Sequence, residues 1–133
     1  MKKKILLILS AITIIFLFLG ITFIVNINRA KKFLNESDRL RGELHAIIKE
    51  EIPKSISEKN DIQLQVNITK GEAKTREIKE FIEKNKSITT NYGEVIGNID
   101  RLNNGFDMMR QGIINKDDDL FNQGFAIVRS SGI

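Results

Sequence analysis

One uninterrupted apolar run organises this sequence: ILLILSAITIIFLFLGITFIV, residues 5–25. It is 21 residues long and contains no charged side chain. At a rise of 1.5 Å per residue, roughly 20 helical residues cross the hydrocarbon core of a bilayer. A cleaved signal peptide has a shorter apolar region of about 7–15 residues, followed by a small-x-small site that is missing here. The run therefore predicts an uncleaved transmembrane anchor, with a cleaved signal peptide and a buried core helix as the alternatives.

Basic residues flank this run on both sides. They are Lys2, Lys3 and Lys4 before the run, and Arg29, Lys31 and Lys32 after it. The positive-inside rule places the more basic flank in the cytoplasm, and a raw count slightly favours the downstream flank. However, a short basic stub followed at once by an apolar core is typical of an export signal. We therefore expect a cytoplasmic stub at 1–4, a cell-membrane anchor at 5–25 and an extracytoplasmic domain at 26–133, with membrane lipid as a partner.

The net charge of +4 belongs mostly to that stub. Without its three lysines the chain has 18 basic and 17 acidic side chains, so the downstream body is almost neutral. A neutral body without basic stripes gives no support for nucleic-acid binding. The sequence has no cysteine and one histidine, His45, which excludes a disulfide framework, a thiolate metal site and a cysteine nucleophile. We expect no cofactor, no metal site and no catalytic residue, and the pattern leaves open whether a small molecule binds.

Helical periodicity continues after the apolar run. Between residues 27 and 52 the apolar side chains are spaced by three and four, which is typical of one helical face. The membrane helix is therefore predicted to continue to about Glu51. Proline disfavours helix at the residue before it and lacks an N–H donor, so Pro53 is predicted to end this helix.

The segment 54–71 is ambiguous. Apolar and polar residues alternate from Ile62 to Ile68, which is the period of a strand. No second run of this kind is available for pairing, and a lone strand is unstable. Capping-box spacings at 55–58 and 69–72 instead favour one short helix between them. Helix, loop and a strand that pairs with another chain all remain open for this segment.

The strongest periodicity lies between Ala73 and Ile114, where an apolar stripe keeps a heptad register. We predict one long helix, with a kink at 87–91 where β-branched residues and Asn91 interrupt it. Apolar e positions and small g positions favour a bundle of several helices over a parallel coiled coil. The candidate helix-packing or interaction face consists of Phe81, Ile88, Tyr92, Val95, Ile99, Leu102, Phe106 and Met109.

Four glycines interrupt that long helix: Gly93, Gly97, Gly105 and Gly112. Each costs about 0.8–1.0 kcal/mol of helix stability relative to alanine. They indicate either a loosely built helix or the close approach of a neighbouring helix. A last helix is predicted after residues 115–117, with a stop at 130–132.

Two groups could carry chemistry, and each has a simpler explanation. Asp117, Asp118 and Asp119 could bind a cation, but acidic residues in a first helical turn also complement the helix dipole and cap free N–H groups. His45 has no nucleophile motif beside it and is interpreted as a surface residue of a helix.

Together these patterns predict an all-α protein. A single transmembrane helix continues into a long helix, which packs in an antiparallel bundle of three to four helices. The function expected is a non-enzymatic extracytoplasmic protein-interaction or scaffold module of a bacterial or phage envelope, with a protein partner or self-association. The alternative is a small sensory or ligand-binding bundle with a pocket near Tyr92 and Phe106.

Overall fold

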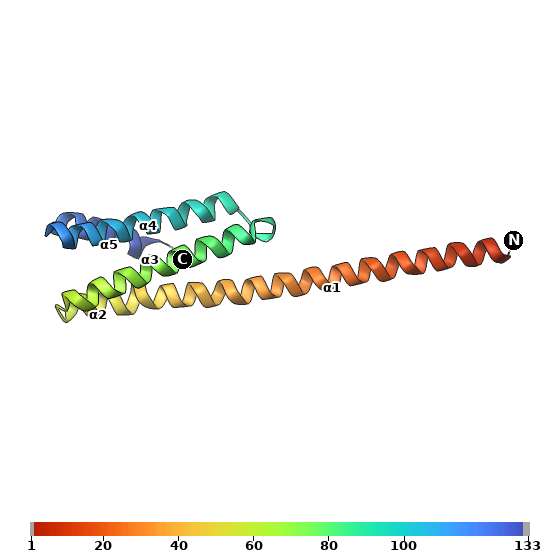
Figure 1. The fold of residues 1–133 in the computed structure, drawn as a ribbon, viewed down its shortest axis with the longest axis horizontal. Helices are drawn as coiled ribbons and strands as arrows, with labels where there is room; N and C mark the ends of the chain where they lie inside the picture. The colour runs from red at the N-terminus through yellow and green to blue at the C-terminus, as the bar shows by residue number, and fades with distance from the viewer. Residues whose placement is uncertain (1, 132–133) are drawn as a thin grey trace. The chain divides into compact units, whose positions relative to one another are not determined.

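The apolar run lies in one long helix, α1 (Lys2–Ala46), in a computed structural model of the chain (Figure 1). The structure describes residues 2–131, and it describes side chains from Thr13 onward. The chain divides into two units, Met1–Glu36 and Ser37–Ile133. The side chains of the three N-terminal lysines, on which the predicted orientation depends, lie outside the described residues.

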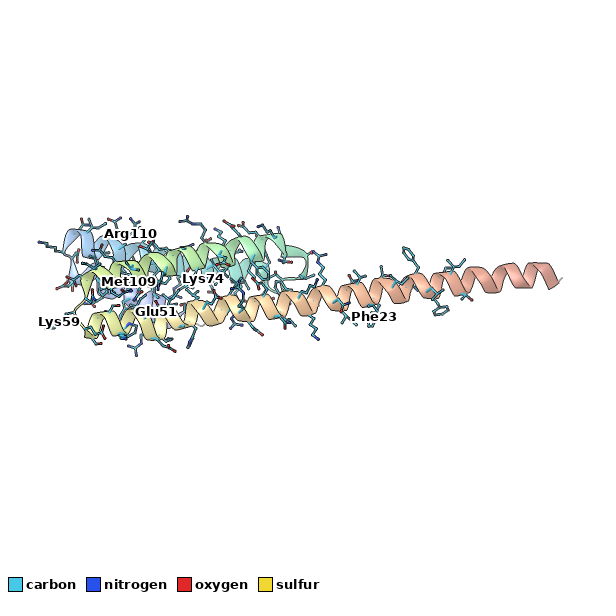
Figure 2. All side chains as sticks on the ribbon, turned by 60° about the horizontal axis from the view of Figure 1, so that its bottom comes forward. Phe23, Glu51, Lys59, Lys74, Met109 and Arg110 are labelled. Carbon is cyan, nitrogen blue, oxygen red and sulfur yellow. The ribbon has the colours of Figure 1, made fainter. Side chains whose placement is uncertain are left out.

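The part of the apolar run whose side chains the structure describes is exposed. Every large apolar side chain described between Ile14 and Val25 has an exposed fraction of 57–71%, and Phe23 is labelled among them in Figure 2. The helical stretch from Thr13 to Ser57 contains an 18-residue window with a mean hydropathy of 1.7, none of it buried. This helix is long and apolar enough to cross a membrane, and its exposure argues against a buried core helix.

The helix does not end before Pro53, contrary to the sequence-based prediction. After Ala46 the chain forms a π-helical turn, η1 (Ile47–Glu51), and then continues as α2 (Ile52–Ser57). The N–H of Ile52 donates to the carbonyl of Ile47, five residues back, which is the wide spacing of a π turn. Pro53 therefore lies in the first turn of α2, where a missing N–H donor costs little.

The ambiguous segment is helical, so the loop and strand alternatives are wrong. Helix α3 (Asp61–Lys84) begins after a tight turn and is capped by Asn60, whose Oδ1 accepts from the N–H of Gln63 at 3.0 Å. Neither predicted capping box starts a helix, because 55–58 lies at the end of α2 and 69–72 lies inside α3. The apolar residues of the alternating run split between two faces of α3, with Leu64 and Ile68 buried and the others exposed.

The long helix predicted from Ala73 to Ile114 is two helices. After α3 the chain forms a short 3-10 turn, η2 (Lys86–Ile88), and α4 (Tyr92–Asn115) follows. Asn91 adopts a left-handed conformation with φ 53°, which breaks the helix where only a kink was expected. The heptad phase continues across this turn because both helices direct their stripes into one core.

Helices α3 and α4 lie against each other along their lengths. Lys79 pairs with Asp100 at 2.7 Å, near the connecting turn, and Arg110 pairs with Glu72 at 3.1 Å, farther from it. Helix α5 (Asp118–Ser130) then packs on α4, as Figure 1 shows. Asp117 caps α5 by accepting from the N–H of Leu120 at 2.9 Å.

Four helical segments of the described chain thus pack together: the Ser37–Ser57 stretch, α3, α4 and α5. Burying one large aliphatic side chain contributes about 1.5–3 kcal/mol. The apolar side chains of this core are Leu40, Leu44, Ile47, Ile48, Ile52, Leu64, Ile68, Ile78, Ile82, Ile99, Leu102, Phe106, Met109 and Val128.

The glycines of α4 divide into two groups. A Cβ atom at Gly105 would lie 2.8 Å from Val128, and one at Gly112 would lie 2.6 Å from the backbone nitrogen of Phe121. Both positions therefore permit the close approach of α5. Gly93 and Gly97 face open space. Close packing explains the first pair, and a loosely built helix describes the second.

Candidate interaction surface

The predicted face of 81–109 is divided between core and surface. Its C-terminal half is buried, with exposed fractions of 0–2%, at Ile99, Leu102, Phe106 and Met109. Its N-terminal half is half-buried around the α3–α4 turn, at Phe81, Ile88, Tyr92 and Val95. The buried half packs helices of the same chain, so only the half near the turn presents surface to another molecule.

Phe106 and Tyr92 each contact groups of the same chain. Phe106 is fully buried, and a Cβ atom added at Gly71 would overlap its ring. At the other end of the stripe, the ammonium of Lys86 lies 4.8 Å from the centre of the Tyr92 ring, within the range of a cation–π contact. Phe106 is thus part of the core, whereas Tyr92 lies half-buried beside the cation of Lys86.

A charged groove of about 450 Å³ lies between α3 and the end of α1. Lys74 lies in it, with a side-chain exposure of 19%, and bonds to Glu43 at 2.6 Å and to Glu77. Arg39 bonds to the same two carboxylates, and Lys70 pairs with Glu51 at 3.0 Å farther along. Each cation of this groove therefore faces an acidic group of the same chain.

These bonds shift the titration of two groups. Hydrogen bonding to Lys74 lowers the pKa of Glu43, although partial burial opposes the shift. The bond to Glu43, followed by the bond to Glu77, raises the pKa of Lys74. The charged forms of both groups are thus favoured. Their ion pairs join the end of α1 to α3, and we call them the α1–α3 clamp.

A buried polar cluster joins α2 to α3 beside the π turn. Asn67 is only 2% exposed, and its Nδ2 donates to Ser55 Oγ at 2.8 Å and to the Glu51 carbonyl at 3.1 Å. Gln63 Nε2 donates to the Oδ1 of Asn67 at 2.9 Å, and Ser55 Oγ donates to the same Glu51 carbonyl. Because buried polar groups are costly unless bonded, this cluster fixes the register between the two helices.

A second groove, of about 300 Å³, lies between the η1–α2 segment and α5. Its apolar lining comes from Ile48, Pro53, Ile56 and Phe125, and its remaining lining residues are Lys49, Ser57 and Arg129. The Nζ of Lys49 donates to the Arg129 carbonyl at 2.8 Å, which holds the two segments together. Both charged lining residues are cations, so this apolar–cationic groove can receive an apolar side chain next to an anion.

The residues considered for chemistry take structural positions. Asp117 caps α5, and Asp118 and Asp119 occupy its first turn. His45 is exposed on α1. Within the described part of the chain, no three His, Cys, Asp or Glu side chains are placed together to hold a metal ion.

Sequence reasoning missed several residues that shape this surface. Lys49 and Arg129 come together across 80 positions, and no local pattern links them. In the sequence, Asn67 is an ordinary polar residue of an ambiguous segment, and Ser55 belongs to a predicted capping box. The one available signal was Asn67 lying between apolar residues at helical spacing, which would place it on the inner face of a helix.

No protein-family model, curated protein or solved structure matches this chain.

Proposed function

We propose that this chain is a single-pass membrane protein whose residues 26–133 form an antiparallel helical bundle outside the cytoplasm. In this proposal it acts as a non-enzymatic protein-interaction or scaffold module of a bacterial or phage envelope. The observation that carries the proposal is the apolar stretch of α1, whose large side chains from Ile14 to Val25 are 57–71% exposed. A helix needs about 20 apolar residues to span the hydrocarbon core of a bilayer, and the apolar run has 21.

Two features of the second unit support an interaction role. The ion pairs Lys79–Asp100 and Arg110–Glu72 fit an antiparallel α3–α4 pair, which gives a rigid scaffold with short connections. The grooves at its surface are shallow spaces between helices, lined by side chains of both segments. Rigid helix faces of this kind are suited to binding another helix.

Topology is the first test. The natural sequence has no cysteine, so a single introduced cysteine reports its own location without background. Asn122→Cys places a thiol on the exposed side of α5, and a cysteine inserted after Met1 serves as the matched control. In intact cells, a membrane-impermeant maleimide should label Asn122→Cys, and it should label the N-terminal cysteine only after permeabilisation. The reverse pattern would place the bundle in the cytoplasm.

Interaction is the second test. A photoactivatable residue at several exposed positions of the bundle should give discrete crosslinked products in native membranes. Self-association would appear as a product of twice the chain's mass, and a different partner as another defined mass. A strictly monomeric chain without crosslinked products at any face would contradict the proposed function.

A further inference from the structure

The apolar–cationic groove differs in charge from the charged groove on the other side of η1. In the charged groove, Lys70 and Lys74 each have a carboxylate partner. In the apolar–cationic groove, neither Lys49 nor Arg129 forms an ion pair with a carboxylate among the residues that the structure describes. This groove therefore has positive charge that is not neutralised by the described part of the chain.

The apolar floor of this groove is only partly covered. Ile56 has an exposed fraction of 36%, and Phe125 is half-buried. Phe125 stacks on Phe121, with ring centres 6.3 Å apart, which fixes one wall. Pro53 stiffens the other wall because its ring restricts the backbone of α2. The groove is preformed, so an incoming side chain would not have to open it.

Lys49 and Arg129 lie beside this apolar floor, and their side chains have further N–H donors. An ammonium group has three N–H donors, and the Lys49 ammonium uses one of them on the Arg129 carbonyl. The guanidinium of Arg129 can bind a carboxylate through two parallel hydrogen bonds. An occupant that combines an apolar side chain with neighbouring carboxylates would satisfy both parts of the groove.

We propose that the apolar–cationic groove binds an acidic amphipathic helix of a protein partner. The two walls of the groove are themselves helical segments, so a third helix can lie along them with its apolar stripe on Ile56 and Phe125. Its acidic residues would face Lys49 and Arg129. This inference rests on the proposed function, because it names the chemistry of the partner that such a module would bind.

The test uses the full chain in nanodiscs of phosphatidylcholine and two fluorescent helical peptides of equal length. Both peptides have leucines at i, i+3, i+4 and i+7, and glutamates flank the leucines in one peptide where lysines flank them in the other. By fluorescence anisotropy, the acidic peptide should bind about tenfold more tightly or better, since opposite charges across an interface favour the correct partner. Equal binding of both peptides would overturn the proposal.

Variants then locate the binding. The double change Lys49→Gln and Arg129→Gln should weaken binding of the acidic peptide by about tenfold while leaving the apolar floor intact. Ile56→Ser should also weaken it, because the residue lies on the floor. Arg76→Glu, on the exposed outer side of α3, is the control and should change the affinity by less than about twofold. The same loss in the control as in the double variant would reject the groove as the site.

Two further outcomes separate this inference from its alternatives. If phosphatidylglycerol vesicles bind through Lys49 and Arg129 while the acidic peptide does not, the groove recognises a lipid headgroup and the proposal is wrong. In native membranes, a photocrosslinker at Ile56 should form a product that the double variant loses. Products from Ile62 on α3 alone would refute the groove but retain the interaction module, whereas an absence of products at every face would contradict the proposed function itself.

Discussion

The ring of Phe106 on α4 occupies the space in which a side chain at Gly71 of α3 would begin. Phe106 is fully buried, and an added Cβ atom at Gly71 would overlap two carbons of its ring. Glycine at this position lets the two helices come close enough for a full aromatic side chain to fill the space between them. The pair therefore sets the spacing of α3 and α4.

Replacing this glycine should weaken the bundle. Gly71→Ala forces the buried ring to move, and overpacking of this kind costs about 1–3 kcal/mol in the free energy of unfolding. Urea denaturation of the full chain in nanodiscs, followed by far-UV circular dichroism, measures the loss. Phe106→Leu in the same chain makes room for the methyl group, so the double variant should lose less than the sum of the two single changes. Strict additivity would show that the two residues do not share this space.

Gly124 of α5 and Gly97 of α4 should respond to alanine in opposite directions. An added Cβ atom at Gly124 would lie 2.5 Å from the Gly105 carbonyl oxygen, so Gly124→Ala should push α5 away from α4 and destabilise the bundle. Gly97→Ala meets open space and should stabilise α4 by about 0.8–1.0 kcal/mol, because alanine is the better helix former. Thermal unfolding of both variants provides the comparison, and a shift in the same direction for both would contradict the close packing.

Two lysines hold left-handed conformations that glycine would adopt more easily. Lys59 and Lys116 have φ values of 53° and 54° and follow the ends of α2 and α4. In each turn the next residue donates an N–H to a carbonyl five positions back, which is the Schellman pattern. Since the left-handed region costs a side-chain-bearing residue roughly 1–2 kcal/mol, Lys59→Gly and Lys116→Gly should each raise the melting temperature.

The control for these turns is a lysine inside a helix. Lys54→Gly, in the exposed middle of α2, should lower stability by about 1 kcal/mol because glycine weakens a helix interior. A lower melting temperature in all three variants would mean that the turns do not favour glycine.

The buried cluster around Asn67 should be sensitive to truncation. Asn67→Ala removes three hydrogen bonds at once and leaves the Glu51 carbonyl and the Gln63 amide without this partner. The expected loss in the free energy of unfolding is about 0.5–1.5 kcal/mol for each hydrogen bond removed. Hydrogen exchange should report it first in α2 and the start of α3. Gln65→Ala, exposed on the same helix, is the control and should stay within about 0.5 kcal/mol of the natural chain.

The contact between Glu43 and Lys74 should make the α1–α3 clamp sensitive to acid. The pKa of Glu43 is lowered in the folded chain, so its contribution is present above the ordinary pKa of glutamate, about 4.3, and disappears as the pH falls through the lower folded value. The pKa of Lys74 is raised, so its contribution is present below the ordinary lysine pKa and disappears only at strongly alkaline pH.

Glu43→Gln separates this effect from general acid sensitivity. Between pH 7 and about pH 3, the melting temperature of the variant should fall less than that of the natural chain, because the glutamine side chain does not titrate. Glu58→Gln, whose pair with Lys54 is exposed and spans 3.9 Å, provides the matched comparison and should behave like the natural chain. Parallel curves of melting temperature against pH for Glu43→Gln and the natural chain would show that this carboxylate does not cause the loss of stability in acid.

Hydropathy and periodicity identified the local parts of this protein. The apolar run, the helical character of 27–51 and the cap at Asp117 all depend on neighbours within a few positions, and the structure confirms a long apolar helix and an all-helical bundle. The same reasoning failed at Pro53, because a π turn moved the proline into the first turn of α2. It also failed at 85–91, because a continuous heptad phase describes one helix and a pair of helices equally well.

The candidate binding groove and the spacing of the helices were decided by contacts between distant residues. Lys49 meets Arg129 across 80 positions, and Glu72 meets Arg110 across 38. An amphipathic pattern shows that a helix has an inner face but does not show which other helix will cover it. That choice depends on side-chain shapes that fit only when the helices are packed, as Gly71 fits Phe106. Hydropathy along the chain was therefore enough to predict a helix that can cross a membrane and a helical domain after it. The surface that another molecule would meet arises only from the packing of these helices.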